Sequence, residues 1–331
     1  MLSRVAESLY WMARYIERAE DVTRLLAVNF NALLDAQPAD ARQGWESIVR
    51  INGDDDPLFA ETYPEANSQS VIQYLFWEPL NPNSVVTCIT RARENARGVR
   101  EQISSEMWEA VNRLYFLTRN AERADALNNA TQFFDLIRDR AQAIQGITSA
   151  TMTHTEPYQF IQLGLYLERA DKTARILDTK YMYLNRFLSS PSESSLQLIT
   201  LLRSCSAFEP YRRSSAGQLD VESVVEYLLI NHEFPRAVLF CLNRCQHTLE
   251  EIGEDTTVPT KSDAPRRMLG RLNADLEYLD IHEILGENME PFLRRFLTRL
   301  NSIGDEIART YFNTSIILPD ERPRQQQQQQ Q

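Results

Sequence analysis

The chain has 331 residues, of which 43% are hydrophobic and 24% charged, and its formal net charge is −11. This length predicts one large core or two packed units of about 150 residues each. The acidic balance argues against a nucleic-acid partner, which would need a basic surface. No apolar run reaches the length of a membrane span, and the first twenty residues lack the features of a signal peptide, so we expect a cytoplasmic protein with no membrane contact.

Apolar residues recur at spacings of three and four along almost the whole chain, and this period predicts an all-α fold. The irregular stretches are expected mainly at 52–67, 207–219 and 254–264, and the polar Gln-rich tail 319–331 is expected to be disordered. About 12 helices are predicted, at residues 3–35, 44–51, 68–78, 82–104, 105–127, 130–150, 157–188, 194–204, 221–231, 235–253, 265–285 and 289–315.

The sequence repeats itself. "YIERAEDVTRLL" at 15–26 returns as "YLERADKTARIL" at 166–177. At an offset of 153, ten identities fall in 42 ungapped positions, where random matching would give roughly two or three. The pattern predicts a tandem duplication of a six-helix unit, with copies at roughly 1–153 and 154–318 inside one helical domain, 1–318. Two copies that share their long first helices would form a pseudo-twofold bundle.

Acidic and basic residues recur at one side of the first repeated helix. On a helical wheel Glu20 falls within the apolar face, while Glu17 and Arg24 lie at its border, and the three span about 60° of arc. The second copy repeats the arrangement with Glu168, Asp171 and Arg175.

A carboxylate inside an apolar stripe is costly unless a cation or several donors meet it. Arg24 and Arg175, one turn further on, are the expected local partners. Three interpretations stay open: intrahelical ion pairs that fix helix orientation, two clusters that face each other across the pseudo-twofold axis and build a polar pocket, or catalysis by the carboxylates.

Several site classes lack their usual residues. The sequence has no Glu-x-x-His pair for a di-iron centre, no phosphate-binding loop and no Gly-x-Ser-x-Gly elbow. The four cysteines form no Cys-x-x-Cys pair and are expected to be buried free thiols. We therefore predict no catalytic residue, no metal and no cofactor.

Arginine-rich stretches offer a different possibility. Arg212-Arg213 follows "AFEPY" in an irregular stretch. Arginine forks suit carboxylates and phosphates, so an anionic ligand or a peptide terminus could dock there. A solvated face balanced by acidic neighbours is the favoured explanation.

Three stretches together, "LSRVAESLYWMARYIERAEDVTRLL", "RARENARGVREQISSEMWEAVN" and "LGLYLERADKTARIL", resemble the bacterial alpha-E domain family, which is all-helical. Their order implies that the family covers residues 1 to about 315. Carried onto this chain, the family motif implies a candidate polar binding centre made of Glu17, Arg18, Glu20, Arg24, Glu94, Asn95, Arg97, Glu168, Arg169, Asp171 and Arg175.

The resemblance also implies partners. Members of this family resemble components of gene clusters that encode an ATP-grasp ligase, a transglutaminase-like protein and sometimes a proteasome-like peptidase. We therefore expect a non-catalytic helical partner or peptide-binding subunit of an ATP-grasp amide ligase, acting in peptide synthesis or modification. The alternatives are a peptide-modifying enzyme that uses Glu20 and Asp171, and a purely structural scaffold.

Overall fold

The computed structural model describes residues 1–33, 37–53, 57–121, 126, 128–184, 191–214, 219–254, 263–285 and 288–312. These residues form helices and no strand, which confirms the all-α prediction. In chain order the α-helices are α1 (Ser3–Leu33), α2 (Pro38–Asn52), α3 (Pro57–Thr62), α4 (Ser68–Ile72), α5 (Val85–Gly98), α6 (Ser105–Arg119), α8 (Ala130–Thr151), α9 (Glu156–Leu184), α10 (Pro191–Ser204), α11 (Phe208–Ser214), α12 (Val221–Ile230), α13 (Val238–Glu254), α14 (Ala264–Glu277), α15 (Ile281–Ile284) and α16 (Met289–Ile307). Short π- or 3₁₀-helical segments lie at Gln73–Trp77, Arg100–Gln102 and Ala308–Phe312.

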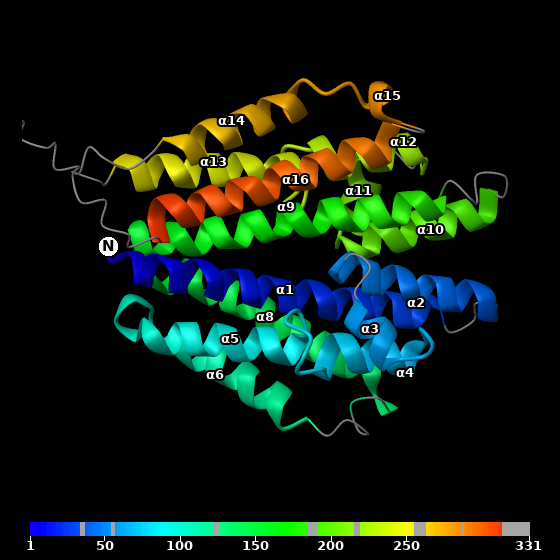
Figure 1. Cartoon of the computed structure of the whole chain (residues 1–331), viewed down its shortest axis with the longest axis horizontal. Coiled ribbons are helices and arrows are strands. Elements are labelled where there is room, and N and C mark those ends of the chain that lie inside the picture. The colour runs from blue at the N-terminus through cyan, green and yellow to red at the C-terminus, as the bar shows by residue number, and fades with distance from the viewer. Residues whose placement is uncertain are drawn as a thin grey trace, which may run out of the picture.

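Helices α1 and α9 lie side by side and parallel at the middle of the bundle (Figure 1). Their contacts advance together along both helices, from Tyr10 beside Gly164 to Asn29, which accepts a hydrogen bond from Lys180 at 3.0 Å. A Cβ atom on Gly164 would lie 2.3 Å from the carbonyl oxygen of Tyr10, so the two backbones approach closely at this glycine. Close approach of this kind needs a residue without a side chain.

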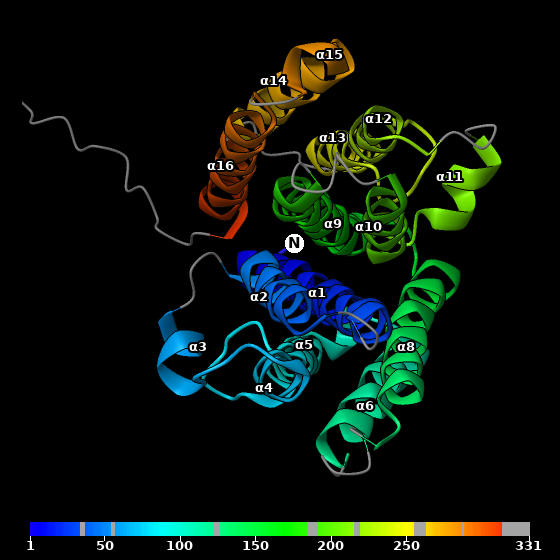
Figure 2. The same cartoon turned by 90° about the vertical axis from the view of Figure 1, so that its right-hand side faces the viewer.

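The remaining helices surround this pair in two groups (Figure 2). Helices α5 and α8 pack on α1, and α6 packs on both of them, while α13 and α16 pack on α9. Helices α2 and α10 bridge the pair, because each of them contacts both α1 and α9. Both central helices are therefore covered on most sides, which explains why so many of their polar residues are buried.

Capping side chains fix where several outer helices begin. Ser84 accepts a hydrogen bond from the N–H of Thr87 at the start of α5, and Ser104 accepts one from Met107 at the start of α6. Asp280 accepts from the N–H of His282 and starts α15. Such caps satisfy backbone donors that have no partner inside the helix.

The helix boundaries follow the sequence prediction in part. Helix α8 matches the predicted helix 130–150 almost residue for residue, but the predicted helix 265–285 is two helices, because the cap at Asp280 begins a new one. The stretches expected to be irregular at 52–67 and 207–219 contain α3 and α11. The described residues hold fifteen α-helices, so the prediction of about 12 was too low. The tail 319–331 lies outside the described residues.

Equivalent positions of the two predicted copies make matching contacts. Arg18 and Arg91 lie over the ring of Tyr15, and their counterparts Arg169 and Arg244 lie over the ring of Tyr166, at 5.6–5.9 Å from the ring centroids. The thiols of Cys88 and Cys241 each donate to the carbonyl oxygen of the proline six residues earlier. Two copies of one unit would form such contacts, and the duplication itself stays a prediction.

All four cysteines are buried free thiols, as predicted. Burial raises the pKa of Cys205 and of Cys241 to about 12, so neither thiol is a nucleophile near neutral pH. Among the described helices, none combines the length and the apolar character that crossing a membrane requires.

Candidate polar centre

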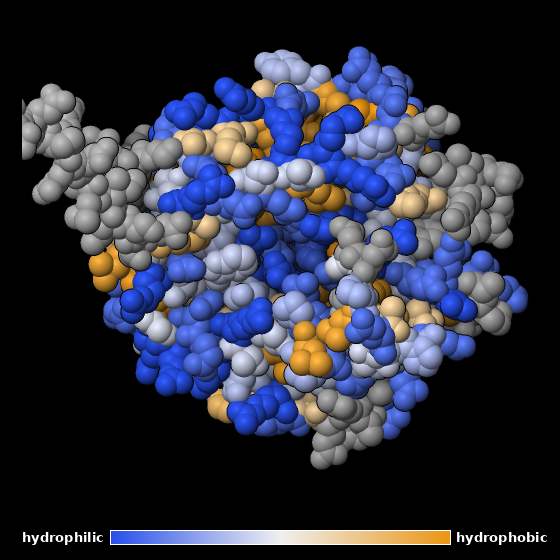
Figure 3. Space-filling model, in the orientation of Figure 1, coloured by the Kyte–Doolittle hydropathy of each residue, from blue (hydrophilic) through white to orange (hydrophobic). Residues whose placement is uncertain are grey.

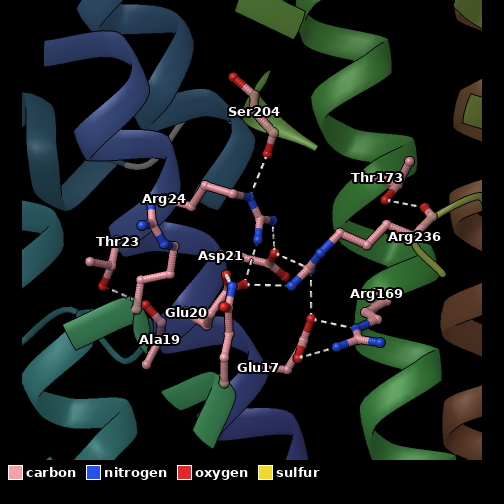
Figure 4. A network of polar contacts seen from close by, with 12 residues as sticks. Glu17, Ala19, Glu20, Asp21, Thr23, Arg24, Arg169, Thr173, Ser204 and Arg236 are labelled. Carbon is pink, nitrogen blue, oxygen red and sulfur yellow. Dashed lines mark hydrogen bonds and ion pairs between the residues drawn. The ribbon is translucent and has the colours of Figure 1, made fainter. Parts of the chain in front are cut away.

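The two central helices exchange arginine–glutamate ion pairs (Figure 4 shows one of them). Arg169 of α9 donates to Glu17 of α1 at 2.7 Å, and Arg18 of α1 donates to Glu168 of α9 at 2.6 Å. Both glutamates are fully buried. Glu17 thus contacts Arg169, and their counterparts in the repeat, Glu168 and Arg18, contact each other. Reciprocal contacts of this kind are typical of a twofold interface.

One of these pairs belongs to a larger acidic cluster, which we call the triad: Glu17, Glu20 and Asp21, each 0% exposed. Arg24, on the same helix, donates to Glu20 at 2.5 Å and also to Asp21. Arg236 donates to all three carboxylates, at 2.7 Å to Glu17, 3.0 Å to Asp21 and 2.8 Å to Glu20 (Figure 4). The triad is therefore tied to its own helix and to a segment more than 200 residues away.

Backbone contacts hold the two arginines in place. Arg236 precedes α13, and its carbonyl oxygen accepts a hydrogen bond from Thr173 of α9 at 2.8 Å. Arg24 donates through Nε to the carbonyl oxygen of Ser204, at the end of α10, at 2.7 Å. The C-terminal end of a helix carries partial negative charge, which suits a cation there.

Glutamines of α8 complete the hydrogen bonds of the triad. Gln142 donates to Glu20 at 3.0 Å, and Gln145 donates to Glu17 at 2.6 Å. The side-chain amide oxygen Oε1 of Gln145 accepts from Arg169 at 2.7 Å. Within the described residues, one oxygen of Asp21 has no hydrogen-bond partner.

The second cluster surrounds Glu168, a single carboxylate with several cations around it. Arg14 and Arg18 donate to its carboxylate at 2.8 and 2.6 Å. Burial tends to raise the pKa of Glu168, but the two arginines outweigh burial and lower it. Burial lowers the pKa of Lys172, one turn further on, whose ammonium donates to Asn52 at 3.3 Å.

This geometry can be compared with known proteins. The Alpha-E family, described as "a predicted alpha-helical domain with a conserved ER motif", matches residues 1–312. The chain belongs to the Alpha-E family. Its described part holds two Glu-Arg dipeptides, Glu17-Arg18 and Glu168-Arg169, and these make the reciprocal ion pairs between α1 and α9. An ER motif on each of two parallel helices therefore lets the glutamate of one meet the arginine of the other.

The relatives of this Alpha-E chain are longer than the chain itself. Uncharacterised proteins of Mycobacterium bovis and Mycobacterium tuberculosis are each 24% identical to it over 339 residues, covering 96% of this chain and 37% of the relative. The chain thus spans little more than a third of those relatives. No solved structure matches the chain.

The structure brings together most of the residues that the Alpha-E resemblance implied. The local partners Glu20–Arg24 and Asp171–Arg175 are confirmed, the second at 2.9 Å. Glu94, Asn95 and Arg97 are placed differently. Glu94 and Arg97 pair with each other at 3.3 Å on the exposed side of α5, and Asn95 is half-buried there, so the prediction that these three share the centre finds no contact among the described residues.

Sequence reasoning missed four residues of the triad and its partners: Asp21, Gln142, Gln145 and Arg236. Asp21 follows Glu20 directly but stands where the second copy has Lys172, so the repeat concealed it. Arg236 lies beside Pro235, a proline that the repeat aligns with Pro82, yet its counterpart is Asn83. The alignment of the copies singled out the shared residues, whereas these contacts depend on where the copies differ.

The triad has the spacing of a metal site, since one oxygen from each carboxylate lies within 4.8 Å of the others. Arg24 and Arg236 already bond to these oxygens, and with Arg169 they bring three positive charges to three carboxylates. A metal ion would have to displace guanidinium groups that are themselves buried, so the donor set fits an arginine-bound triad better than a metal site.

Glu20 and Asp21 of the triad differ in acidity. Burial tends to raise the pKa of Glu20, but Arg236, Arg24 and Gln142 outweigh it and hold that pKa at about 2. Burial raises the pKa of Asp21, and Arg24 and Arg236 act to lower it. The negative charges of Glu17 and Glu20 add to the rise, and the resulting pKa is about 7. Asp21 therefore takes up a proton at a higher pH than Glu20 does.

The titration of Asp21 should be visible in stability. Its pKa rises from 3.8 to about 7 on folding, so the folded state binds this proton more tightly and loses stability as the pH rises between those values. The slope from this one group approaches about 1.4 kcal/mol per pH unit. We expect Asp21→Asn to remove it, leaving a flatter profile of unfolding free energy in urea between pH 5 and 7.5. Equal slopes in both proteins would contradict the assignment.

Proposed function

We propose that this Alpha-E chain is a non-catalytic binding subunit that works with an ATP-grasp amide ligase on a peptide. The observation that carries the non-catalytic part is the saturation of the polar centre. Glu17, Glu20 and Glu168 are buried, and each meets at least two arginine side chains. A carboxylate held this way is a poor general base, because arginine donors occupy its oxygens, and the arginines also lower the pKa of Glu20 and of Glu168.

The class of partner comes from the resemblance, and the length of the relatives supports the idea of a partner. In those mycobacterial proteins the matched region is attached to further chain, which accounts for 63% of each, 100% less the 37% covered. Because the matched region is joined to further chain in the mycobacterial proteins, the present chain is a candidate to act together with a separate protein.

An apolar cleft supplies a surface for protein contact. It lies between α6 and α8, has a volume of about 1080 Å³ and includes Phe116, Leu117, Phe133 and Leu136 in its lining. Phe116 is 50% exposed and Leu136 38%. Exposed apolar groups gathered at one place are typical of protein-binding sites.

The proposal can be tested with the purified chain and the ATP-grasp ligase from the same source. We expect the two to co-elute in size-exclusion chromatography and the ligase to release ADP faster when the chain is present. Phe116→Asp should weaken the association at least tenfold by placing a charge in the cleft. Leu80→Asp is the matched control, because Leu80 is an exposed leucine outside the cleft.

The outcome that would overturn the proposal is equally clear. If the two proteins neither associate nor change ADP release, the chain is not a subunit of this ligase. If they associate but Phe116→Asp and Leu80→Asp behave alike, the cleft is not the docking surface.

One observation favours the enzyme alternative: Asp21 has a pKa of about 7 and an oxygen without a described partner, both of which suit proton transfer. On that alternative, Asp21→Asn, Glu20→Gln or Asp171→Asn would abolish product formation in folded protein. On the proposal above, product formation by the ligase with the chain persists in all three variants. A purely structural scaffold predicts that the same substitutions change stability alone, with no ligase association in any of them.

A further inference from the structure

A cleft of about 600 Å³ lies directly against the polar centre. Its lining comes from α9, α11, α12 and the segment that leads into α13, and it includes Arg169, Arg213, Tyr227, Glu233, Phe234 and Arg236. The volume is in the range of pockets for small ligands or a residue or two of peptide. Two residues of the cleft, Arg169 and Arg236, are among the three arginines that bind the triad.

The floor of the cleft is held in place by hydrogen bonds and is rich in donors. Arg169 and Arg236 are 8% and 7% exposed, and each makes three hydrogen bonds within the centre. A guanidinium has five N–H groups, so each arginine retains donors beyond those bonds. Because the carboxylates already hold both side chains, a ligand would not have to order them, which favours binding.

The rim of the cleft supplies a cation that is not used in an ion pair of the described residues. The three carboxylates of the triad balance Arg24, Arg169 and Arg236, whereas Arg213 forms no ion pair within the part of the chain that the structure describes. Burial raises the pKa of the Tyr227 hydroxyl, Ser214 and Arg213 act to lower it, and Glu233 acts to raise it, so both charged residues of the rim lie near this ring. A cation without an ion-pair partner, above a donor-rich floor and with the Glu233 carboxylate at the same rim, matches a singly charged anion such as a carboxylate better than a phosphate dianion.

The other side of the cleft has the chemistry to hold a peptide. The carboxylate of Glu233 is exposed at the rim and can accept an N–H, which a peptide offers and a phosphate lacks. The rings of Tyr227 and Phe234 lie 5.2 Å apart and form an apolar wall. A terminal residue has all three complementary features: a carboxylate, a peptide N–H and a side chain.

We propose that this cleft binds the C-terminal carboxylate of a peptide, with Arg213 as its counter-charge and the floor arginines as donors. The choice of a peptide rests on the proposed function, while the binding of a carboxylate rests on the cleft. The proposal names the group that the chain would present to a ligase that forms amide bonds at carboxylates.

The test measures binding to the full chain, without any ligase, by isothermal titration calorimetry. The probes are N-acetyl-Ala-Phe as the free acid, the same dipeptide as the C-terminal amide, and inorganic phosphate. We expect the acid to bind at least tenfold more tightly than the amide. Arg213→Met should weaken the acid at least tenfold and leave the amide unchanged, since Arg213 meets only the terminal charge.

Arg212→Met is the matched control, because Arg212 is the neighbouring exposed arginine, is paired with Glu209 at 3.1 Å and does not line the cleft. It should change neither affinity by more than about twofold, since exposed ion pairs contribute little. Equal binding of acid and amide, no binding of either at millimolar concentration, or no effect of Arg213→Met would each overturn the proposal. If phosphate binds more tightly than the dipeptide acid does, and Arg213→Met abolishes that binding, the cleft is a phosphate site instead.

The two proposals fail separately. Ligase association is read out by chromatography and is sensitive to Phe116, on the opposite group of helices from the cleft. Peptide binding is read out by calorimetry and is sensitive to Arg213. If the chain binds the dipeptide acid but not the ligase, the proposed carboxylate site stands and the proposed partner is wrong.

Discussion

Replacing Arg236 with methionine should lower the free energy of unfolding by about 3–5 kcal/mol, the range for removing one partner from a buried ion pair. Methionine keeps much of the length of the side chain but leaves Glu17, Glu20 and Asp21 with only Arg24 and Arg169. One buried negative charge would then be unbalanced. Since Asp21 can neutralise it by taking up a proton, the loss should be smaller at pH 5 than at pH 8. Urea denaturation at both pH values measures the effect.

Arg42→Met is the control for that substitution. Arg42 pairs with Glu46 at 3.0 Å on the surface of α2, with 61% of its side chain exposed, so its loss should change stability by no more than about 1 kcal/mol. A similar small loss in Arg236→Met would mean that the triad does not need this arginine as its counter-charge.

The second large effect concerns the contact between the central helices. Gly164→Ala should destabilise the fold by roughly 1–3 kcal/mol, towards the upper end of the range for overpacking, because the new methyl group meets the backbone of Tyr10 rather than a movable side chain. The two helices would have to separate, and the ion pairs at Glu17 and Glu168 would lengthen with them. Thermal or urea unfolding, with circular dichroism as the signal, reports the change.

Gly146→Ala provides the opposite case. Gly146 lies inside α8, and a Cβ atom there would meet nothing within 4 Å. Alanine is the better helix former, so this variant should gain about 0.5–1 kcal/mol. If Gly146→Ala raises the free energy of unfolding and Gly164→Ala lowers it, the space between α1 and α9, and not helix propensity, decides the result at Gly164.

Helical periodicity predicted the class of fold and the partners within a helix, because both depend on residues three and four apart. Glu20–Arg24 and Asp171–Arg175 were found in this way. The short helices α3 and α11 were not, since six or seven residues contain too few turns for a period to stand out. A capped break such as Asp280 leaves the apolar spacing almost intact and so hides the end of one helix and the start of the next.

The rest of the centre depends on packing between distant segments. Nothing in the local sequence says that Arg236 reaches Glu17, 219 residues earlier, or that glutamines of α8 meet the same carboxylates. Nor does a wheel of one helix say which charged residues face another helix: Glu94 and Arg97 have the spacing of the motif but lie on the solvent side of α5. The choice between an intrahelical pair and a shared centre is made by tertiary structure.

The two central helices share reciprocal ion pairs at Glu17-Arg18 and Glu168-Arg169, but they differ one turn further on. This difference has a consequence for how such a molecule can evolve. Positions 21 and 172 are equivalent in the repeat but hold aspartate and lysine. In an assembly of two separate identical chains, one mutation would change both positions at once, and opposite charges could never arise there. A tandem duplication, which the repeat predicts for this chain, escapes that constraint, because positions 21 and 172 then mutate separately. The α1 side can become an acidic triad beside a cleft while the α9 side keeps its cations around Glu168.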